Sequence, residues 1–110
     1  MLYLMVRDAP GFIRFLKAVF GAVEVTRAEA PDGTILMAEL AIAGESLVLS
    51  AAGGPYPPQA ITIELGVARE ALDGMVRNAV AVGAAAERVA EGAVVRDPAG
   101  NAWRLRAATV

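Results

Sequence analysis

Two of the residue types that most often carry enzyme chemistry are absent from this sequence of 110 residues. It has no cysteine, which excludes disulfides, thiolate metal sites and cysteine nucleophiles. It also has no histidine, the commonest general base and the commonest metal ligand in proteins. Acid–base chemistry or metal binding in this chain would therefore have to rely mainly on carboxylates.

Aromatic residues and a surplus of either charge are also scarce. Phe, Trp and Tyr make up 5% of the chain, and ten basic and twelve acidic residues, mixed along the sequence, give a net charge of −2. A nucleic-acid-binding surface needs clustered basic side chains and often aromatic platforms for bases. Nucleic acid is therefore not an expected partner.

Long apolar runs are missing too, although 56% of the residues are hydrophobic. No run approaches the roughly 20 residues that cross a bilayer. The apolar start reaches Arg7 and Asp8 too soon for a signal peptide and has no basic lead-in. We expect no membrane partner and a cytoplasmic location. We also expect one domain over residues 1–110, because a chain of this length can form a hydrophobic core without disulfides or a structural metal.

The first half of the chain predicts a strand, a helix and three further strands. An apolar strand over residues 2–6 leads to Asp8, a typical N-cap, with Pro10 in the first turn of a helix that ends at Gly21. The further strands are expected at residues 22–29, 35–42 and 47–49.

The second half repeats that order after a segment rich in glycine and proline. This segment, at about 53–59, is predicted to be a linker between a first repeat over about 1–52 and a second over about 60–110. The second repeat is expected to contain a strand at 61–67, a helix at 70–82 ended by Gly83, and strands at 84–89, 92–96 and 102–106. The apolar side of this helix is expected to comprise Leu72, Met75, Val76 and Val80.

The two halves can be laid over each other, with Gly21 on Gly83 and residues 44–49 on residues 100–105. A sheet with one helix cannot close a core alone, so the halves should join. The predicted fold class is α+β: two βαβββ repeats that form a curved, cup-shaped eight-stranded mixed sheet with helices on the outer face.

Four stretches carry a resemblance to a known family: YLMVRDA at 3–9, FLKAVFGA at 15–22, LMAEL at 36–40 and RDPAGNAW at 96–103. In this order they resemble the vicinal oxygen chelate (glyoxalase/bleomycin resistance/dioxygenase) superfamily, and within it the PhnB-like branch. The resemblance implies the cup-shaped fold. In the enzymes of that family, a divalent metal in the cup is held by His, Glu or Gln and acts as a Lewis acid.

The metal-ligand positions that the resemblance implies are not suited to a metal here. Mapped through the repeat, they fall on Met1, Val48, Thr62 and Arg104. A hard divalent ion prefers oxygen ligands, and a guanidinium would repel it. The histidines frequent in the PhnB-like branch would fall on Met37 and Asn101. We expect no metal of the family type and no cofactor.

Strand alternation assigns the remaining candidates to faces. The rows expected to pack under the helices are Leu2, Leu4 and Val6, then Ile61, Ile63, Leu65 and Val67, with Leu47, Leu49, Trp103 and Leu105. The opposite rows face the cup and hold Tyr3, Met5, Met37, Glu39, Ser46, Val48, Ser50, Thr62, Glu64, Arg104 and Arg106. Within these rows, the expected ligand-binding residues are Tyr3, Met37, Glu39, Thr62, Glu64 and Arg104.

Arg104 has two compatible interpretations. Its forked guanidinium either binds an anionic or carbonyl group of a ligand, or forms an ion pair with Glu39 or Glu64 that neutralises the family's metal position. Glu39 and Glu64 are also the candidate catalytic bases, if a dry cup raises a pKa. As a pair without a third ligand, they would hold a relocated metal only weakly.

Three functions follow, and the sequence leaves open whether the protein is an enzyme. The first is a metal-independent small-molecule binding protein with an apolar cup and Arg104 as polar anchor. The alternative is a lyase, isomerase or dioxygenase-type enzyme of the same superfamily, with a relocated or absent metal and Glu39 or Glu64 as base. The third is a structural or regulatory protein with a vestigial cup. Open strand edges and the resemblance both favour a homodimer.

Overall fold

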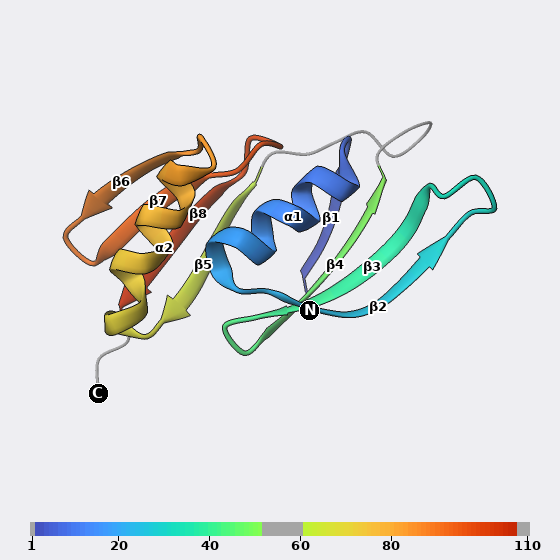
Figure 1. Cartoon of the computed structure of the whole chain (residues 1–110). Helices are drawn as coiled ribbons and strands as arrows, with labels where there is room; N and C mark the ends of the chain where they lie inside the picture. Colours follow the sequence, from blue (N-terminus) through green and yellow to red (C-terminus); the bar gives the residue numbers. More distant parts are fainter. Residues whose placement is uncertain (1, 52–60, 108–110) are drawn as a thin grey trace.

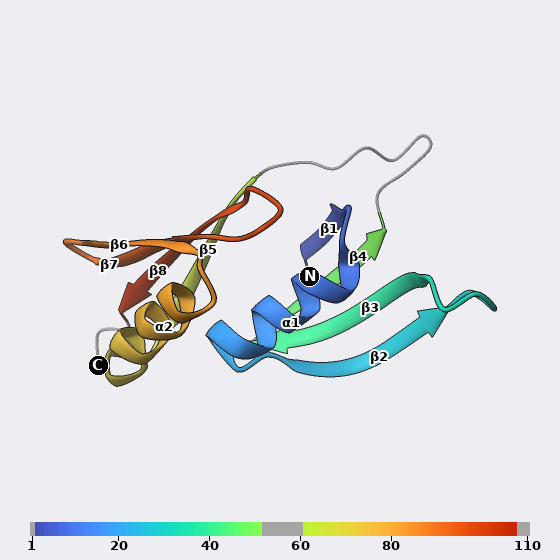
Figure 2. The same cartoon turned by 45° about the horizontal axis from the view of Figure 1, so that its top comes forward.

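The chain forms two successive βαβββ halves (Figure 1). The computed structural model describes residues 2–51 and 61–107, apart from the side chain of Ala51, so the predicted linker at about 53–59 lies outside the described residues. In both views the two halves lie side by side, each with one helix (Figure 2). None of the helices in the described segments has the length and apolar character that crossing a bilayer demands.

The first half confirms the predicted elements. Its strands and helix are β1 (Leu2–Val6), α1 (Ala9–Phe20), β2 (Val23–Glu29), β3 (Ile35–Ile42) and β4 (Glu45–Ala51). The one clear difference is β4, which extends beyond the predicted 47–49 because it pairs with strands on both sides.

The ends of α1 follow from local chemistry. The Asp8 carboxylate accepts a hydrogen bond of 3.1 Å from the backbone N–H of Gly11, one of the donors that has no partner within the helix. At the other end Gly21 adopts a left-handed conformation with φ of 66°, and its N–H closes the last turn on the Lys17 carbonyl. Glycine adopts this conformation without the steric cost that other residues carry.

The second half contains β5 (Thr62–Val67), α2 (Arg69–Ala81), β6 (Ala85–Val89), β7 (Gly92–Arg96) and β8 (Ala102–Ala107). The predicted boundaries are confirmed to within about two residues. The prediction for the buried stripe of α2 is wrong at one position, because Ala79 is buried and Val80 is exposed. Ala79 continues the helical spacing from Leu72 and Val76, whereas the helix rotation carries Val80 to the solvent side.

The same strand order occurs in both halves, which confirms the internal repeat. The first sheet has the order β1-β4-β3-β2 and the second β5-β8-β7-β6. In each sheet the first strand pairs parallel with the last, and the other pairs are antiparallel. The eight strands of the predicted cup therefore form two separate four-stranded mixed sheets, one in each half, and these two modules fit a half-barrel.

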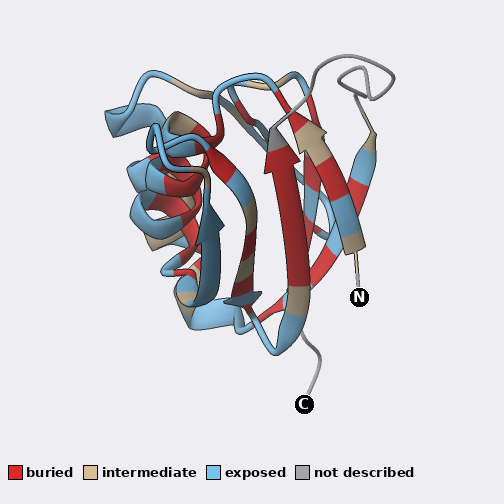
Figure 3. Ribbon diagram, turned by 90° about the vertical axis from the view of Figure 1, so that its right-hand side faces the viewer, coloured by how far each residue is buried: buried red, intermediate tan, exposed pale blue. Residues whose placement is uncertain are grey.

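One continuous core joins the halves on the side that the helices cover. Seen from the side, both helices lie on one side of the strands, and the other side carries no helix (Figure 3). The rows predicted to pack under the helices are buried, with Leu2 and Ile61 only partly so. Across the junction, the ring of Phe20 in α1 lies 5.0 Å from that of Trp103 in β8, centroid to centroid. Burial of these apolar side chains supplies most of the driving force for folding.

A buried carboxylate organises the turn between β7 and β8. Asp97 is only 6% exposed, and it accepts hydrogen bonds from the backbone N–H groups of Ala99 and Asn101, the Asn101 amide and the Trp103 indole. The Asn101 amide oxygen in turn accepts a bond of 2.9 Å from the N–H of Ile61, just before β5. Asp97 therefore links the turn, the core tryptophan and the start of the second half.

We predict that Asp97→Ala lowers the free energy of unfolding by about 3 kcal/mol, because buried donors lose their acceptor. Urea unfolding followed by Trp103 fluorescence measures this loss. Asp32→Ala is the matched control, since Asp32 accepts a backbone hydrogen bond from Thr34 in an exposed turn. An equal loss in both variants would contradict the role assigned to Asp97.

Candidate functional site

The helix-free face of the first sheet has a central row formed by neighbouring strands. Val48 in β4 pairs with Tyr3 in β1 on one side and with Glu39 in β3 on the other. Glu39 pairs in turn with Thr26 in β2. Because residues paired across strands point to the same face, all four side chains belong to one surface.

Two hydrogen bonds order the polar groups of this surface. The Tyr3 hydroxyl lies 2.9 Å from the Ser50 hydroxyl, and the Ser46 hydroxyl donates a bond of 3.1 Å to the Glu39 carboxylate. The Glu39 carboxylate therefore accepts a hydrogen bond from the neutral hydroxyl of Ser46, and does not form the predicted ion pair with Arg104. Tyr3 is 57% exposed, so much of its ring surface is accessible.

The helix-free face of the second sheet carries the arginines. Glu64 in β5 lies opposite Arg104 in β8 in the strand register, yet its carboxylate forms an ion pair with a different arginine. Arg106 Nη1 lies 2.7 Å from Glu64 Oε1, whereas Arg104 Nη2 reaches only Glu91 Oε2, at 3.9 Å. The alternative in which Arg104 pairs with Glu39 or Glu64 is therefore wrong. The Arg104 side chain is 52% exposed.

A cavity of about 340 Å³ lies where the two halves meet. Both faces reach it, through Ser46 from the first sheet and Thr62 and Glu64 from the second. Its other lining residues are Leu2, Ile42, Glu45, Leu47, Ile63, Leu65 and Trp103. The cavity thus combines an apolar wall with a few hydroxyls and carboxylates.

The cavity includes only part of the predicted ligand-binding set. Thr62 and Glu64 line it, whereas Tyr3, Met37, Glu39 and Arg104 lie elsewhere on the helix-free faces. Sequence reasoning missed Glu45, since only the packing of the halves brings the start of β4 beside β5. No periodic pattern within either strand signals that contact.

The metal positions of the predicted family do not fit a divalent ion. Met1 lies outside the described residues, and Val48 offers only hydrocarbon. Thr62 is one neutral hydroxyl and Arg104 is a cation, so the set contains no anionic ligand. Within residues 2–51 and 61–107, no three acidic side chains come together as a metal-binding group.

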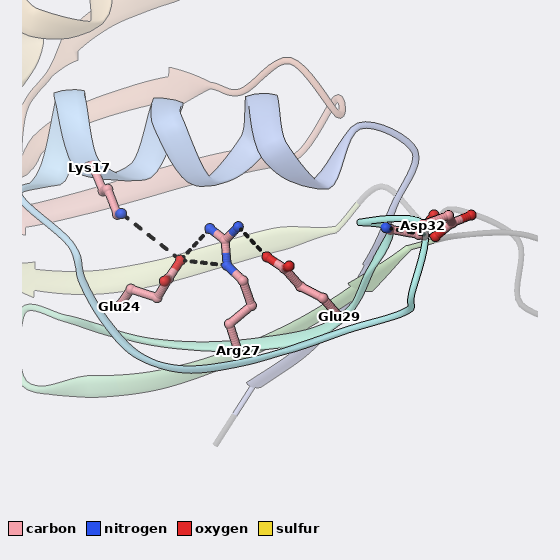
Figure 4. Close-up of polar contacts among 6 residues, drawn as sticks. Lys17, Glu24, Arg27, Glu29 and Asp32 are labelled. Atoms are coloured by element: carbon pink, nitrogen blue, oxygen red, sulfur yellow. Dashed lines mark hydrogen bonds and ion pairs between the residues drawn. The ribbon is translucent and has the colours of Figure 1, made fainter.

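The principal charge cluster of the first half lies away from these faces (Figure 4). Arg27 in β2 bonds Glu24 and Glu29 on the same strand, and Lys17 of α1 approaches Glu24 at 3.9 Å. The Arg27 hydrogen bond holds the pKa of Glu24 below its usual value. Ionised Glu24 therefore stabilises the folded state at pH values above the pKa that Glu24 has in the unfolded chain. This contribution is lost as the pH falls through the pKa of Glu24 in the folded protein, and screening by solvent keeps it small.

Comparison with solved structures identifies the architecture. TioX from Micromonospora sp. ML1 matches with a TM-score of 0.79 and 24% identity, over 96% of this chain and 94% of that one. This chain has the vicinal oxygen chelate fold. A gene product from Arabidopsis thaliana shares the fold at a TM-score of 0.73 and 25% identity, over 96% of this chain and 94% of that one.

A third vicinal oxygen chelate neighbour is a fosfomycin resistance protein, FosX from Listeria monocytogenes. It matches at a TM-score of 0.77 and 17% identity, over 99% of this chain and 90% of that one. Its structure holds Mn(II) and 1S,2S-dihydroxypropylphosphonic acid. No protein-family model matches the present chain, and no curated protein matches it significantly. Function must therefore be argued from the site itself.

Proposed function

We propose that this protein is a metal-independent small-molecule binding protein whose ligand sits in the cup, with Arg104 as polar anchor. The observation that carries the proposal is the cavity of about 340 Å³ between the halves, with an apolar wall and a few polar groups. Small-molecule sites have this form, and about 300 Å³ is the lower end of their usual volume.

The proposed ligand-binding residues are Tyr3, Met37, Glu39, Thr62, Glu64 and Arg104. Thr62 and Glu64 line the cavity, and Arg104 occupies the pairing position beside Glu64. The Arg104 contact to Glu91, at 3.9 Å, is too long for a hydrogen bond. Its fork of donors therefore remains available for an anionic or carbonyl group of a ligand.

Metal independence is supported by the chemistry of the family positions Val48 and Arg104 and of Glu64, a candidate ligand of a relocated metal. Val48 is a hydrocarbon side chain and Arg104 would repel a cation, while Glu64 is already occupied by Arg106. The Mn(II) in FosX belongs to that protein, which shares 17% of its residues with this chain.

The second candidate is an enzyme of the same superfamily, of lyase, isomerase or dioxygenase type. One observation favours it: the Glu64 carboxylate lines the cavity, where it could act as a base toward a bound ligand. A relocated metal or a metal-free reaction fits this candidate, with Glu39 or Glu64 as base. The ion pair between Glu64 and Arg106 counts against it, because Arg106 already occupies the carboxylate oxygen that would have to accept a proton.

We also propose a homodimer of the PhnB-like branch, located in the cytoplasm. The outermost strands of the two sheets are β1, β2, β5 and β6. Large apolar side chains are exposed on them, among them Tyr3, Val23 and Val25. A second copy would cover both the strand edges and this apolar surface.

The metal question is tested on protein purified without chelator. We expect saturating Mg²⁺, Mn²⁺, Zn²⁺, Ni²⁺ or Fe²⁺ to leave the melting temperature within about 1 °C of its value in chelator, since a ligand stabilises only what it binds. Anomalous diffraction should show no metal in the cup, and Arg104 should point into it. A metal held by Glu39 or Glu64 would restore the Lewis-acid enzyme.

The dimer is tested by light scattering during gel filtration at micromolar concentration. We expect twice the mass of one chain. Val23→Glu, which adds a charge to the exposed strand β2, should shift the protein toward monomer. Val80→Glu, on the exposed side of α2, is the matched control and should leave the mass unchanged. A monomeric wild-type protein would refute the dimer without affecting the binding proposal.

A further inference from the structure

The charged side chains that line the cavity between the halves are acidic. They are Glu45, at the start of β4, and Glu64, in β5. Among the described residues that line this cavity, none is a lysine or an arginine. Arg104, the polar anchor of the proposed function, lies outside the lining. A group that enters the cavity therefore meets negative charge at its wall.

The tight turn between β3 and β4 carries Glu45 to the cavity. Ala43 and Gly44 form this turn with φ of 49° and 81°, and Ile42 pairs with Glu45 across it. A two-residue turn of this kind fixes the register of the strands that it joins. Ile42 and Glu45 both line the cavity, so the end of one hairpin supplies a hydrocarbon surface and a carboxylate side by side.

The two carboxylates differ in how far their charge is compensated. Glu64 Oε1 lies 2.7 Å from Arg106 Nη1, which neutralises much of the Glu64 charge. Glu45 forms no ion pair within residues 2–51 and 61–107. Its side chain is exposed, so a cation can reach it directly from solvent. Glu45 is therefore the principal uncompensated charge of the cavity.

A neighbouring carboxylate makes the hydroxyl of Ser46 a hydrogen-bond acceptor for the cavity. Ser46 donates its proton to Glu39, with 3.1 Å between the oxygens. A hydroxyl has one proton and two lone pairs, so Ser46 Oγ is left to accept from a ligand. The ionised carboxylates of Glu45 and Glu64 also only accept. Three of the four hydroxyl and carboxyl groups in the lining thus require a donor, and the fourth, Thr62, adapts to either.

The rest of the lining favours an organic cation over a metal ion. It consists of Leu2, Ile42, Leu47, Ile63, Leu65 and Trp103. A metal ion gains nothing from hydrocarbon and needs more oxygen ligands than this wall offers. An organic ammonium uses both kinds of surface, because its N–H groups donate to the oxygens while its carbon skeleton packs on the apolar side chains.

We propose that the cavity selects ligands that carry a protonated primary amine on a compact apolar body, such as an alicyclic or branched aliphatic amine. The ammonium donates hydrogen bonds to Glu45 and Ser46, Glu64 adds negative charge, and the body fills the hydrocarbon part. This inference rests on the proposed binding function and names the ligand class of its cavity. It does not depend on Arg104, which lies outside the lining.

Three probes share one ring and differ in the head group. Cyclohexylmethylamine is a cation at neutral pH, cyclohexylmethanol is its neutral counterpart, and cyclohexanecarboxylate is an anion of similar size. Binding is followed on the whole chain through the fluorescence of Trp103, the one tryptophan of the sequence, which lines the cavity. Isothermal titration calorimetry gives an independent measurement of the same affinities.

We expect the amine to bind about tenfold more tightly than the alcohol, as one charge-assisted interaction allows, and the carboxylate to bind more weakly than either. Glu45→Gln should weaken the amine about fivefold and leave the alcohol unchanged, because it removes the charge and keeps the shape. Glu87→Gln is the matched control, since Glu87 is an exposed glutamate of β6 outside the cavity lining. Added salt should weaken the amine alone.

The outcomes separate this inference from the function on which it rests. Equal affinities for amine and alcohol, or an amine affinity that Glu45→Gln leaves unchanged, would overturn the cationic ligand while retaining a small-molecule site. Tightest binding of the carboxylate, lost in Arg104→Gln, would support the polar anchor and overturn the inference. Equal losses in Glu45→Gln and Glu87→Gln would show a general charge effect and overturn it too. Failure of all three probes would overturn it and count against the binding function itself.

Discussion

Burial of one face of each sheet beneath its helix is the constraint on which the rest of the structure depends. Leu4 and Leu49 in the first half, and Leu65 and Leu105 in the second, turn to the helices and join a single core. Trp103 and Phe20 close that core across the junction. With one face of each sheet committed in this way, the opposite faces are left to solvent, a ligand or a second copy.

The two halves share a backbone plan but differ in what their free faces present. Val48 and Arg104 occupy equivalent places in β4 and β8, each between the first and third strands of its sheet. One is a hydrocarbon and the other a cation. Since alternation in a strand fixes only the direction of a side chain, the repeat preserves the core rows while the free rows diverge.

Neighbours at 17 to 25% identity share this fold with TM-scores of 0.73 to 0.79. Fold is maintained at that distance because a core requires apolar volume and pattern more than particular residues. A site requires particular atoms at particular distances, so the Mn(II) in the FosX structure describes that protein's site and not the one in this chain. The chemistry of this cup must be read from its own side chains.

The order of elements, the repeat and the buried rows could be predicted from the sequence, because caps, turns and two-residue alternation act over a few neighbouring positions. Asp8, Gly21 and Gly83 marked helix ends in this way. Through the resemblance, the sequence also predicted that the positions of the family's metal ligands hold unsuitable residues here.

Tertiary structure alone decided which charges meet. Glu64 lies opposite Arg104 in the strand register but forms an ion pair with Arg106, because side-chain length and packing decide which charged groups meet. It also decided that Glu45 lines the cavity, and that Ala79 of α2 is buried while Val80 is exposed. Such contacts join residues far apart in the chain or depend on how one half sits against the other. No local pattern encodes them.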